Sequence, residues 1–318
     1  MARKLSDNIA KSFVHLMNFN PEQKDSVVWA FKVYEKMGNL LPKTSAFRGK
    51  IEKHDAFGVP MEIFRPRKGE SKKLIFIIHG GGFIMGLTNI YRNLSHVYSH
   101  ENKGATVINI DYRTAPEFKY PSAHDDVMSA WDYILSLGYD PKNIVIIGDS
   151  AGGNLMLSLL IKLRDENREM PVATVAISPW ACLEASSPSI KTNYQKDIAF
   201  GNRKGEFDDE KLEQFLNCGL FSYVGDADRS DKYLSVVRGD YHGMPPMLMT
   251  VGSDECLLDD TLIVANKIKE AGGEVEVIIG EGMFHIYPLF FRLSATAKED
   301  FKKILNFIRK HLGIEVVN

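Results

Sequence analysis

Short, continuous apolar segments recur along the chain and alternate with helical patterns. Most carry apolar residues at nearly every position, which is typical of strands buried on both faces of a parallel sheet. The first two instead flank Gly58 and look like a strand pair. The eight expected strands are residues 50–54, 60–64, 74–78, 105–110, 144–147, 172–177, 247–251 and 275–279. This order predicts an α/β fold with a mostly parallel eight-stranded sheet, right-handed crossovers and helices on both faces.

Amphipathic helices are expected between these strands. They comprise residues 123–137, 155–163 and 260–271, and a last helix with Phe301, Ile304, Leu305, Ile308 and Leu312 on one face. Two stretches of the chain are not needed for this alternation of strands and helices. Residues 1–45 show two further helices, the first with Ile9, Phe13 and Leu16, and the second beginning at Pro21. The connection between Ile177 and Met247 is about 70 residues long, with a helical pattern at 208–220, and connections of that length are usually functional. We therefore expect one domain over residues 46–318, with additions at 1–45 and about 180–235.

The composition argues against several classes of protein. Lys and Arg number 39 and Asp and Glu 41, so the net charge of -2 gives no reason to expect a nucleic-acid partner. Cys182, Cys218 and Cys256 are odd in number and contain no CxxC pair, which argues against a disulfide framework and a structural zinc site. No signal-peptide pattern or stretch of about 20 apolar residues is present. We expect a cytoplasmic protein that does not enter a membrane.

A strand, a tight turn and a helix meet at one serine. The expected strand at 144–147 runs directly into Gly148-Asp149-Ser150-Ala151-Gly152-Gly153-Asn154. The pattern Gly-x-Ser-x-Gly in this context is typical of a nucleophile elbow, where a Cβ two residues before or after the serine would collide with its neighbours. The serine oxygen then lies at a helix N-terminus, whose partial charge favours developing negative charge. Ser150 is therefore the candidate nucleophile.

A second glycine cluster follows the strand at 74–78. It reads His79-Gly80-Gly81-Gly82-Phe83, and residues without side chains let the backbone N–H groups approach a substrate closely. In a hydrolase, the N–H groups of Gly81 and Gly82 would act with that of Ala151 as an oxyanion hole. A GxGxxG site fails because Met85 stands where the third glycine should be, and no P-loop motif is present. His79 itself is expected to anchor the loop.

The base and the acid should follow the serine along the chain. Of the downstream histidines, His311 lies in the last helix and His242 precedes a strand, at the wrong end of the sheet. His285 follows the strand at 275–279, at the carboxyl edge where ligands bind in open α/β sheets, and is the candidate base. The acid should follow the strand at 247–251, where Asp254 and Glu255 are both candidates. Asp259 and Asp260 are expected to cap the next helix or to charge its first turn.

Several motifs in the same order resemble the bacterial hormone-sensitive-lipase-like family of α/β-hydrolase carboxylesterases. Besides the two glycine motifs, these are Asp111-Tyr112-Arg113-Thr114-Ala115-Pro116-Glu117, Tyr120-Pro121-Ser122-Ala123, Ser178-Pro179-Trp180, Gly243-Met244-Pro245-Pro246 and Gly282-Met283-Phe284-His285. The resemblance implies an α/β-hydrolase fold in which residues 1–45 and part of the insertion form a helical cap over the active site. Laid without a gap, the family's acid segment favours Glu255 over Asp254. Phe83, Trp180 and Phe284 flank the motifs and are candidate pocket walls, although each could equally belong to the core.

The expected activity is hydrolysis of short-chain acyl esters, such as acetyl esters, through an acyl-enzyme, without metal or organic cofactor. A lactone or amide hydrolase and a sugar deacetylase would use the same residues. A non-catalytic binding relative should lack Ser150 or His285, and both are present. The expected partner is a small-molecule ester, and whether the chain forms a homodimer stays open.

Overall fold

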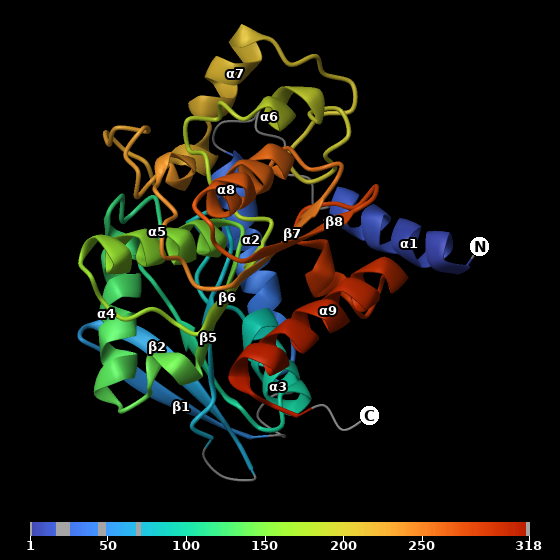
Figure 1. Ribbon diagram of the computed structural model, residues 1–318. Coiled ribbons are helices and arrows are strands. Elements are labelled where there is room, and N and C mark those ends of the chain that lie inside the picture. The colour runs from blue at the N-terminus through green and yellow to red at the C-terminus, as the bar shows by residue number, and fades with distance from the viewer. Residues whose placement is uncertain (1, 17–25, 44–48, 68–70, 316–318) are drawn as a thin grey trace.

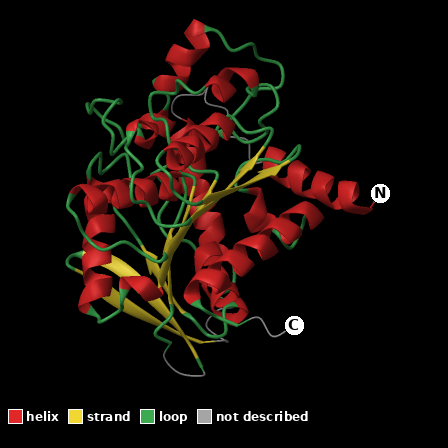
Figure 2. Cartoon of the chain, viewed as in Figure 1, coloured by secondary structure: helices red, strands yellow, loops and turns green. Residues whose placement is uncertain are grey.

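An eight-stranded sheet forms the centre of the molecule (Figures 1 and 2). The computed structural model describes residues 2–16, 26–43, 49–67 and 71–315. The strand order is β1-β2-β4-β3-β5-β6-β7-β8. The strands are β1 Gly49–Ala56, β2 Val59–Pro66, β3 Leu74–Ile78, β4 Thr106–Ile110, β5 Ile144–Asp149, β6 Ala173–Ile177, β7 Met247–Gly252 and β8 Val275–Gly280. Strands β1 and β2 pair antiparallel, as do β2 and β4, whereas all pairs from β4 to β8 are parallel. The predicted fold class is confirmed.

Helices cover both faces of the sheet, which explains why its central strands are apolar at every position. In β3, Leu74, Phe76 and Ile78 pack into one core cluster, whereas Ile75 and Ile77 pack into another. The first core lies under α4 Ser122–Ser136, α5 Ala151–Asp165 and α8 Leu258–Glu270. The second lies under α3 Asn89–Glu101 and α9 Ala295–Leu312. Alternation of side chains between the faces of a strand therefore supplies two apolar layers.

Helix α3 was not predicted from the sequence. Its buried face combines Tyr91, Leu94 and Tyr98, at helical spacing, with the buried polar residues Asn89, Ser95 and Ser99. Ser95 Oγ donates to the Tyr91 carbonyl and accepts from Asn109 Nδ2, so its burial is compensated by hydrogen bonds. These buried polar residues weaken the apolar pattern that would mark the segment as a helix in the sequence.

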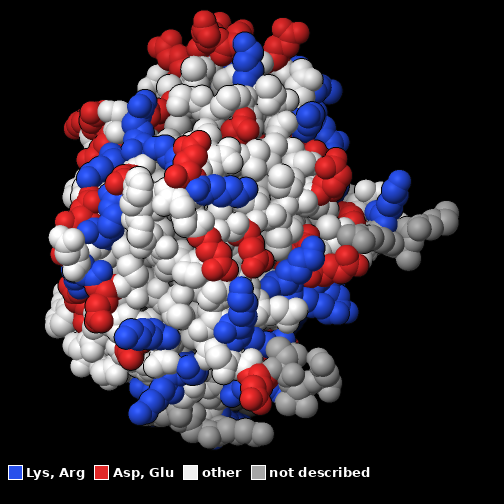
Figure 3. Space-filling view, viewed as in Figure 1, with Lys and Arg blue, Asp and Glu red and all other residues white. Residues whose placement is uncertain are grey.

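The two stretches in excess of the basic scheme contribute α1 Ala2–Leu16, α2 Ser26–Leu40, α6 Pro188–Thr192 and α7 Asp209–Leu216. Helices α6 and α7 stand at the top of Figure 1, and acidic side chains gather at the same end of the molecule in Figure 3. The helix expected at 208–220 is shorter, because α7 ends at Leu216 and a separate turn of 3₁₀-helix, η3, covers Gly219–Phe221. The expected start of the second helix at Pro21 falls outside the described residues.

The carboxyl ends of the parallel strands carry the loops that matter for chemistry. The segments after β3, β5, β7 and β8 contain the Gly81 loop, Ser150, Glu255 and His285 respectively. Because these strands are parallel, all four segments emerge at the same edge of the sheet. Within the described residues, no helix is long and apolar enough to cross a membrane.

Candidate active site

Ser150 lies in the tight turn between β5 and α5, in a backbone conformation that residues other than glycine rarely adopt. Its φ is 54° and its ψ is -120°, and its N–H donates to the Ile177 carbonyl at 2.9 Å. A Cβ on Gly152 would come within 2.1 Å of the Ile78 carbonyl oxygen, and one on Gly148 within 2.4 Å of the Gly152 carbonyl oxygen. Close backbone contacts therefore require both glycines. The strand and helix on either side of Ser150 keep it in its strained backbone conformation.

His285 connects Ser150 to an acidic residue. Its Nε2 lies 2.9 Å from Ser150 Oγ, and its Nδ1 lies 2.8 Å from Glu255 Oε2. The Glu255 side chain is completely buried, and Ser150 and His285 are also buried. The three side chains form one hydrogen-bonded chain, although they come from three separate loops. Such a chain can withdraw a proton from the serine and stabilise the imidazolium that results.

The structure brings Glu255, rather than Asp254, to His285. Glu255 Oε1 accepts hydrogen bonds from the Gly252 N–H at 2.5 Å and from Ser178 Oγ at 2.8 Å. These two donors leave Oε2 directed at the imidazole. The Asp254 carboxylate instead lies 3.4 Å from Ser253 Oγ. The backbone turn after β7 therefore places Glu255, rather than Asp254, against the imidazole.

The glycine loop after β3 lies beside the nucleophile. Gly81 and Gly82 have φ values of 116° and 62°, a region that favours glycine. Gly82 and Ser150 line the same cavity. Ala151 is the first residue of α5, so its N–H is among those that have no partner within the helix. The N–H groups of Gly81, Gly82 and Ala151 are thus carried by the two loops that flank the serine oxygen.

Asp149 ties the glycine loop to the elbow. Its Oδ1 accepts from the Gly80 N–H at 3.1 Å and its Oδ2 from Tyr91 Oη at 2.8 Å. Tyr91 Oη also accepts from the Gly80 N–H at 2.9 Å. Burial raises the pKa of Asp149 to about 6, although Tyr91 and His285 oppose the shift. A Cβ on Gly80 would lie 2.3 Å from this carboxylate, so the absence of a side chain there permits the contact.

The raised pKa of Asp149 predicts a pH dependence of stability. A carboxyl group with a native pKa of about 6 and an ordinary value of 3.8 is deprotonated first in the unfolded chain, so native stability falls as pH rises between these values. Asp149→Asn cannot ionise. We expect its free energy of unfolding, relative to the parent, to rise by about 2 kcal/mol between pH 4 and pH 7, measured by urea denaturation. A difference that is flat across this range would contradict the expectation.

His79 lies behind the glycine loop and contacts it from the core. Its ring stacks on Tyr112 with centroids 4.2 Å apart, and its Nδ1 lies 2.8 Å from the Gly80 carbonyl oxygen. Tyr112 Oη donates to the His79 carbonyl at 2.8 Å. Burial lowers the pKa of the imidazole, so this side chain is neutral at pH 7. These contacts fit the expected anchoring of the loop.

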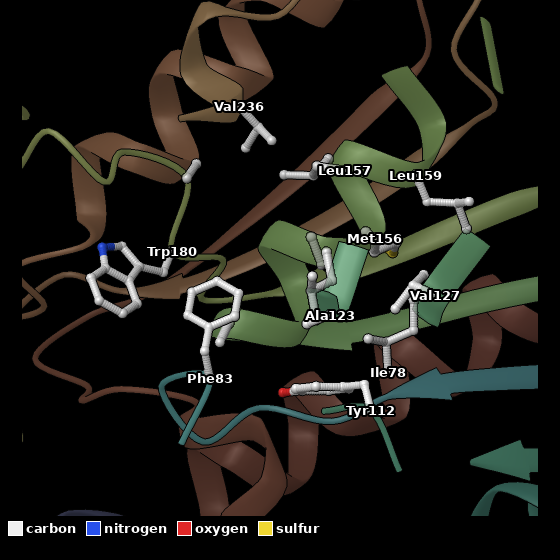
Figure 4. Packing of buried hydrophobic residues seen from close by; sticks show 14 of the residues in the cluster. Ile78, Phe83, Tyr112, Ala123, Val127, Met156, Leu157, Leu159, Trp180 and Val236 are labelled. Carbon is white, nitrogen blue, oxygen red and sulfur yellow. The ribbon is translucent and has the colours of Figure 1, made fainter. Parts of the chain in front are cut away.

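The cavity at Ser150 is mostly apolar. It is lined by Gly82, Ser150, Trp180, Ile190, Phe200, Phe215, Leu220, Cys256 and Leu257. Of the three aromatic residues expected at its walls, Trp180 lines it. Phe83 is instead buried against Tyr223, with ring centroids 4.4 Å apart, and Figure 4 shows its ring beside Trp180. Phe284 packs against Phe290 in a separate core cluster, so Phe83 and Phe284 belong to the core.

Cys256 contributes a thiol to this cavity. Burial, together with the Asp197 carboxylate, raises its pKa well above the ordinary value. The side chain is therefore a neutral thiol at pH 7, which makes it a poor nucleophile beside Ser150. Its place in the cavity wall is that of a small apolar residue.

Two residues near the site have contacts that the sequence did not predict. Ser178 follows β6 with a φ of 46°, and its Oγ accepts from the Ile286 N–H while donating to Glu255. In the sequence it stands out only as part of a family motif.

Asp260 lies in the first turn of α8, but Leu257 takes the cap position. The buried Asp260 carboxylate accepts from the N–H groups of Ala181 and Cys182, both at 2.8 Å, so it fixes the start of the insertion rather than capping the helix.

A metal-binding arrangement is not found at this site. Across residues 2–16, 26–43, 49–67 and 71–315, no three His, Cys, Asp or Glu side chains are grouped so that they could hold an ion. The chemistry that this arrangement can support is that of an activated serine.

Comparison with known proteins identifies the fold family of the chain. Residues 75–289 match a family model described as alpha/beta hydrolase fold. The chain belongs to the α/β-hydrolase fold family. This α/β-hydrolase is 32% identical over 241 residues to an esterase of Acinetobacter venetianus, a match that covers 76% of each chain. It is 29% identical to an acetyl-hydrolase of Streptomyces hygroscopicus over 88% of its own length and 93% of the relative's.

A solved structure places this α/β-hydrolase more closely within the family. It superposes on an esterase from the bacterial hormone-sensitive lipase (HSL) family with a TM-score of 0.84 and 27% identity, over 98% of this chain and 100% of the other. The resemblance inferred from the motifs is therefore confirmed.

Proposed function

We propose that this α/β-hydrolase is a serine carboxylesterase that hydrolyses small esters with short acyl chains through an acyl-enzyme. The observation that carries the proposal is the hydrogen-bonded chain from Ser150 Oγ through His285 to Glu255, beside a cavity that Gly82 and Ser150 share. The names of the relatives, esterase and acetyl-hydrolase, support the same reaction class.

In the first step, Ser150 Oγ attacks the ester carbonyl carbon while His285 Nε2 accepts the serine proton. Glu255 holds Nδ1 of the imidazole and stabilises the imidazolium. The carbonyl oxygen becomes an oxyanion, which the N–H groups of Gly81, Gly82 and Ala151 bind. Each such donor is worth about 3 kcal/mol in the transition state of related enzymes.

Collapse of the tetrahedral intermediate breaks the bond to the alcohol oxygen. His285 returns its proton to that oxygen, and the alcohol leaves with Ser150 acylated. His285 then accepts a proton from water, which attacks the acyl carbon. The second tetrahedral intermediate releases the carboxylic acid, and the proton returns to Ser150.

The cavity walls support a preference for short acyl chains. Trp180, Phe215 and Leu220 close the space around Ser150, and all three are buried. Leu220 Cδ1 and Phe31 Cε1 lie 3.0 and 3.2 Å from the position that a Cβ on Gly82 would take, so η3 and α2 meet over the glycine loop. Within the proposal, residues 1–45 and about 180–235 act as a cap that limits substrate size and excludes water.

A series of p-nitrophenyl esters from acetyl to palmitoyl tests the preference. We expect the highest kcat/KM among the acetyl to hexanoyl esters, because longer chains must displace the buried side chains that close the cavity. Initial rates of nitrophenolate release measure it, with the Ser150→Ala variant giving the background. Highest activity on the palmitoyl ester would overturn the short-chain preference, whereas no activity on any ester would overturn the proposed reaction.

A further inference from the structure

Helix α6 and the residue after it hold the loop that carries Glu255 through side-chain hydrogen bonds. We refer to residues 252–257 as the acid loop. Asn193 Nδ2 donates to the Glu255 carbonyl at 2.8 Å and to the Ser253 carbonyl at 3.0 Å. Ser189 Oγ donates to the Cys256 carbonyl at 2.7 Å. The backbone on both sides of Glu255 is therefore held by side chains of the insertion, about 60 residues earlier in the chain.

Asp197 contacts this loop and a second part of the site. Its Oδ2 accepts from the Cys256 N–H at 2.7 Å, directly after Glu255. Its Oδ1 accepts from the N–H groups of Ala199 and Phe200 at 2.8 and 3.0 Å, which fixes a tight turn. The side chain is only 2% exposed. A buried carboxylate needs such donors, and three backbone N–H groups supply them.

The turn held by Asp197 places Phe200 against the imidazole of His285. The two rings lie 4.8 Å apart between centroids with an interplanar angle of 69°, an edge-to-face contact. Phe200 also lines the cavity at Ser150. The two oxygens of one carboxylate thus hold the loop of the acid and the aromatic ring that packs on the base.

We propose that Asp197 is a positioning residue for the His285–Glu255 pair, an inference that rests on the proposed function. It acts through the Cys256 N–H on the acid loop and through Phe200 on the imidazole. An asparagine has one oxygen, whereas both ends of the Asp197 side chain face N–H donors. Asp197→Asn therefore turns an amide N–H against a backbone N–H at one of the two ends. The acid loop or the Phe200 turn must then loosen.

Steady-state kinetics of Asp197→Asn on a p-nitrophenyl acetate substrate provide the first test. We expect kcat to fall about 10- to 100-fold, the range for losing a hydrogen bond to a charged group, with a much smaller change in KM. Asp228→Asn is the matched control. Asp228 accepts from the Ser230 N–H at 2.9 Å in a similar turn of the same insertion and is exposed. We expect this variant to keep the parental kcat.

The proton between His285 Nδ1 and Glu255 supplies a readout that does not depend on turnover. In the parent it should give a downfield proton resonance, and in Asp197→Asn that resonance should broaden or move upfield. Asp197→Ser serves if the asparagine variant does not fold, because a hydroxyl can keep the turn while the Cys256 N–H loses its acceptor.

Parental kcat together with an unchanged resonance in a folded Asp197 variant would overturn the inference. A loss of activity that matches only a loss of folded protein, with the resonance in place, would also overturn it. Failure of the proposed function is distinguishable, because it would appear as an inactive parent enzyme, whereas the resonance would still report on the His285–Glu255 contact.

Discussion

Replacing Ser150 by alanine should reduce kcat for p-nitrophenyl acetate by about 10⁴- to 10⁶-fold, the range that loss of an activated serine produces in other hydrolases. The physical reason is that the oxygen that forms the acyl-enzyme is removed, whereas the cavity and the glycine loop stay in place. Some acceleration over water should therefore persist. Hydrolysis rates measured at high enzyme concentration, after correction for the uncatalysed reaction, give the residual kcat.

The Ser158→Ala variant is the matched control for this experiment. Ser158 is a buried serine two turns further along α5, and it is not among the cavity-lining residues. It should keep the parental kcat, so that a loss in Ser150→Ala reports on the nucleophile rather than on a disturbed helix. Retention of more than a tenth of the activity in Ser150→Ala would refute the assignment of Ser150.

Replacing Glu255 by glutamine should lower kcat by about 10⁴-fold, as the equivalent amide substitution does in a serine protease triad. The amide can no longer stabilise an imidazolium, and its NH₂ group would face donors at Gly252 and Ser178 or the imidazole itself. Circular dichroism should show that the variant folds, and kcat on the acetyl ester measures the effect.

Asp254→Asn is the paired variant for this comparison. The Asp254 carboxylate lies near Ser253 Oγ rather than His285, so we expect its loss of kcat to be far smaller. If Asp254→Asn proved the more damaging change, the role of the acid would move to Asp254.

Local sequence patterns predict a structural feature where the residues that require it are neighbours in the chain. The apolar runs at β3 and β5 require burial on both faces, so they indicated a parallel sheet covered by helices. Gly148 and Gly152 are needed within a turn of five residues, so the elbow could be recognised from neighbouring positions. The placement of His285 after β8 followed from the order of the strands. Each of these inferences rests on contacts between residues that are close in the sequence, or on the regular alternation of strands and helices.

The tertiary structure alone decided which groups meet across the chain. Asp254 and Glu255 have the same chemistry, and only the turn after β7, with its donors from Gly252 and Ser178, directs Glu255 at His285. The contact between Asp197 and Cys256 spans 59 residues of sequence and leaves no periodic signal in the chain. Helix α3 buries hydroxyl groups that read as solvent-facing in isolation. Phe83 follows the glycine cluster and Trp180 ends the Ser-Pro-Trp motif, so the sequence treats both as candidate pocket walls. In the structure Phe83 packs on Tyr223 in the core, whereas Trp180 lines the cavity. The sequence by itself thus determined the sheet, the elbow and the order along the chain of the candidate catalytic residues. Only the folded chain specifies which carboxylate meets His285, which side chains line the cavity and how the insertion binds the acid loop. All three depend on side-chain contacts between segments that are distant in the sequence.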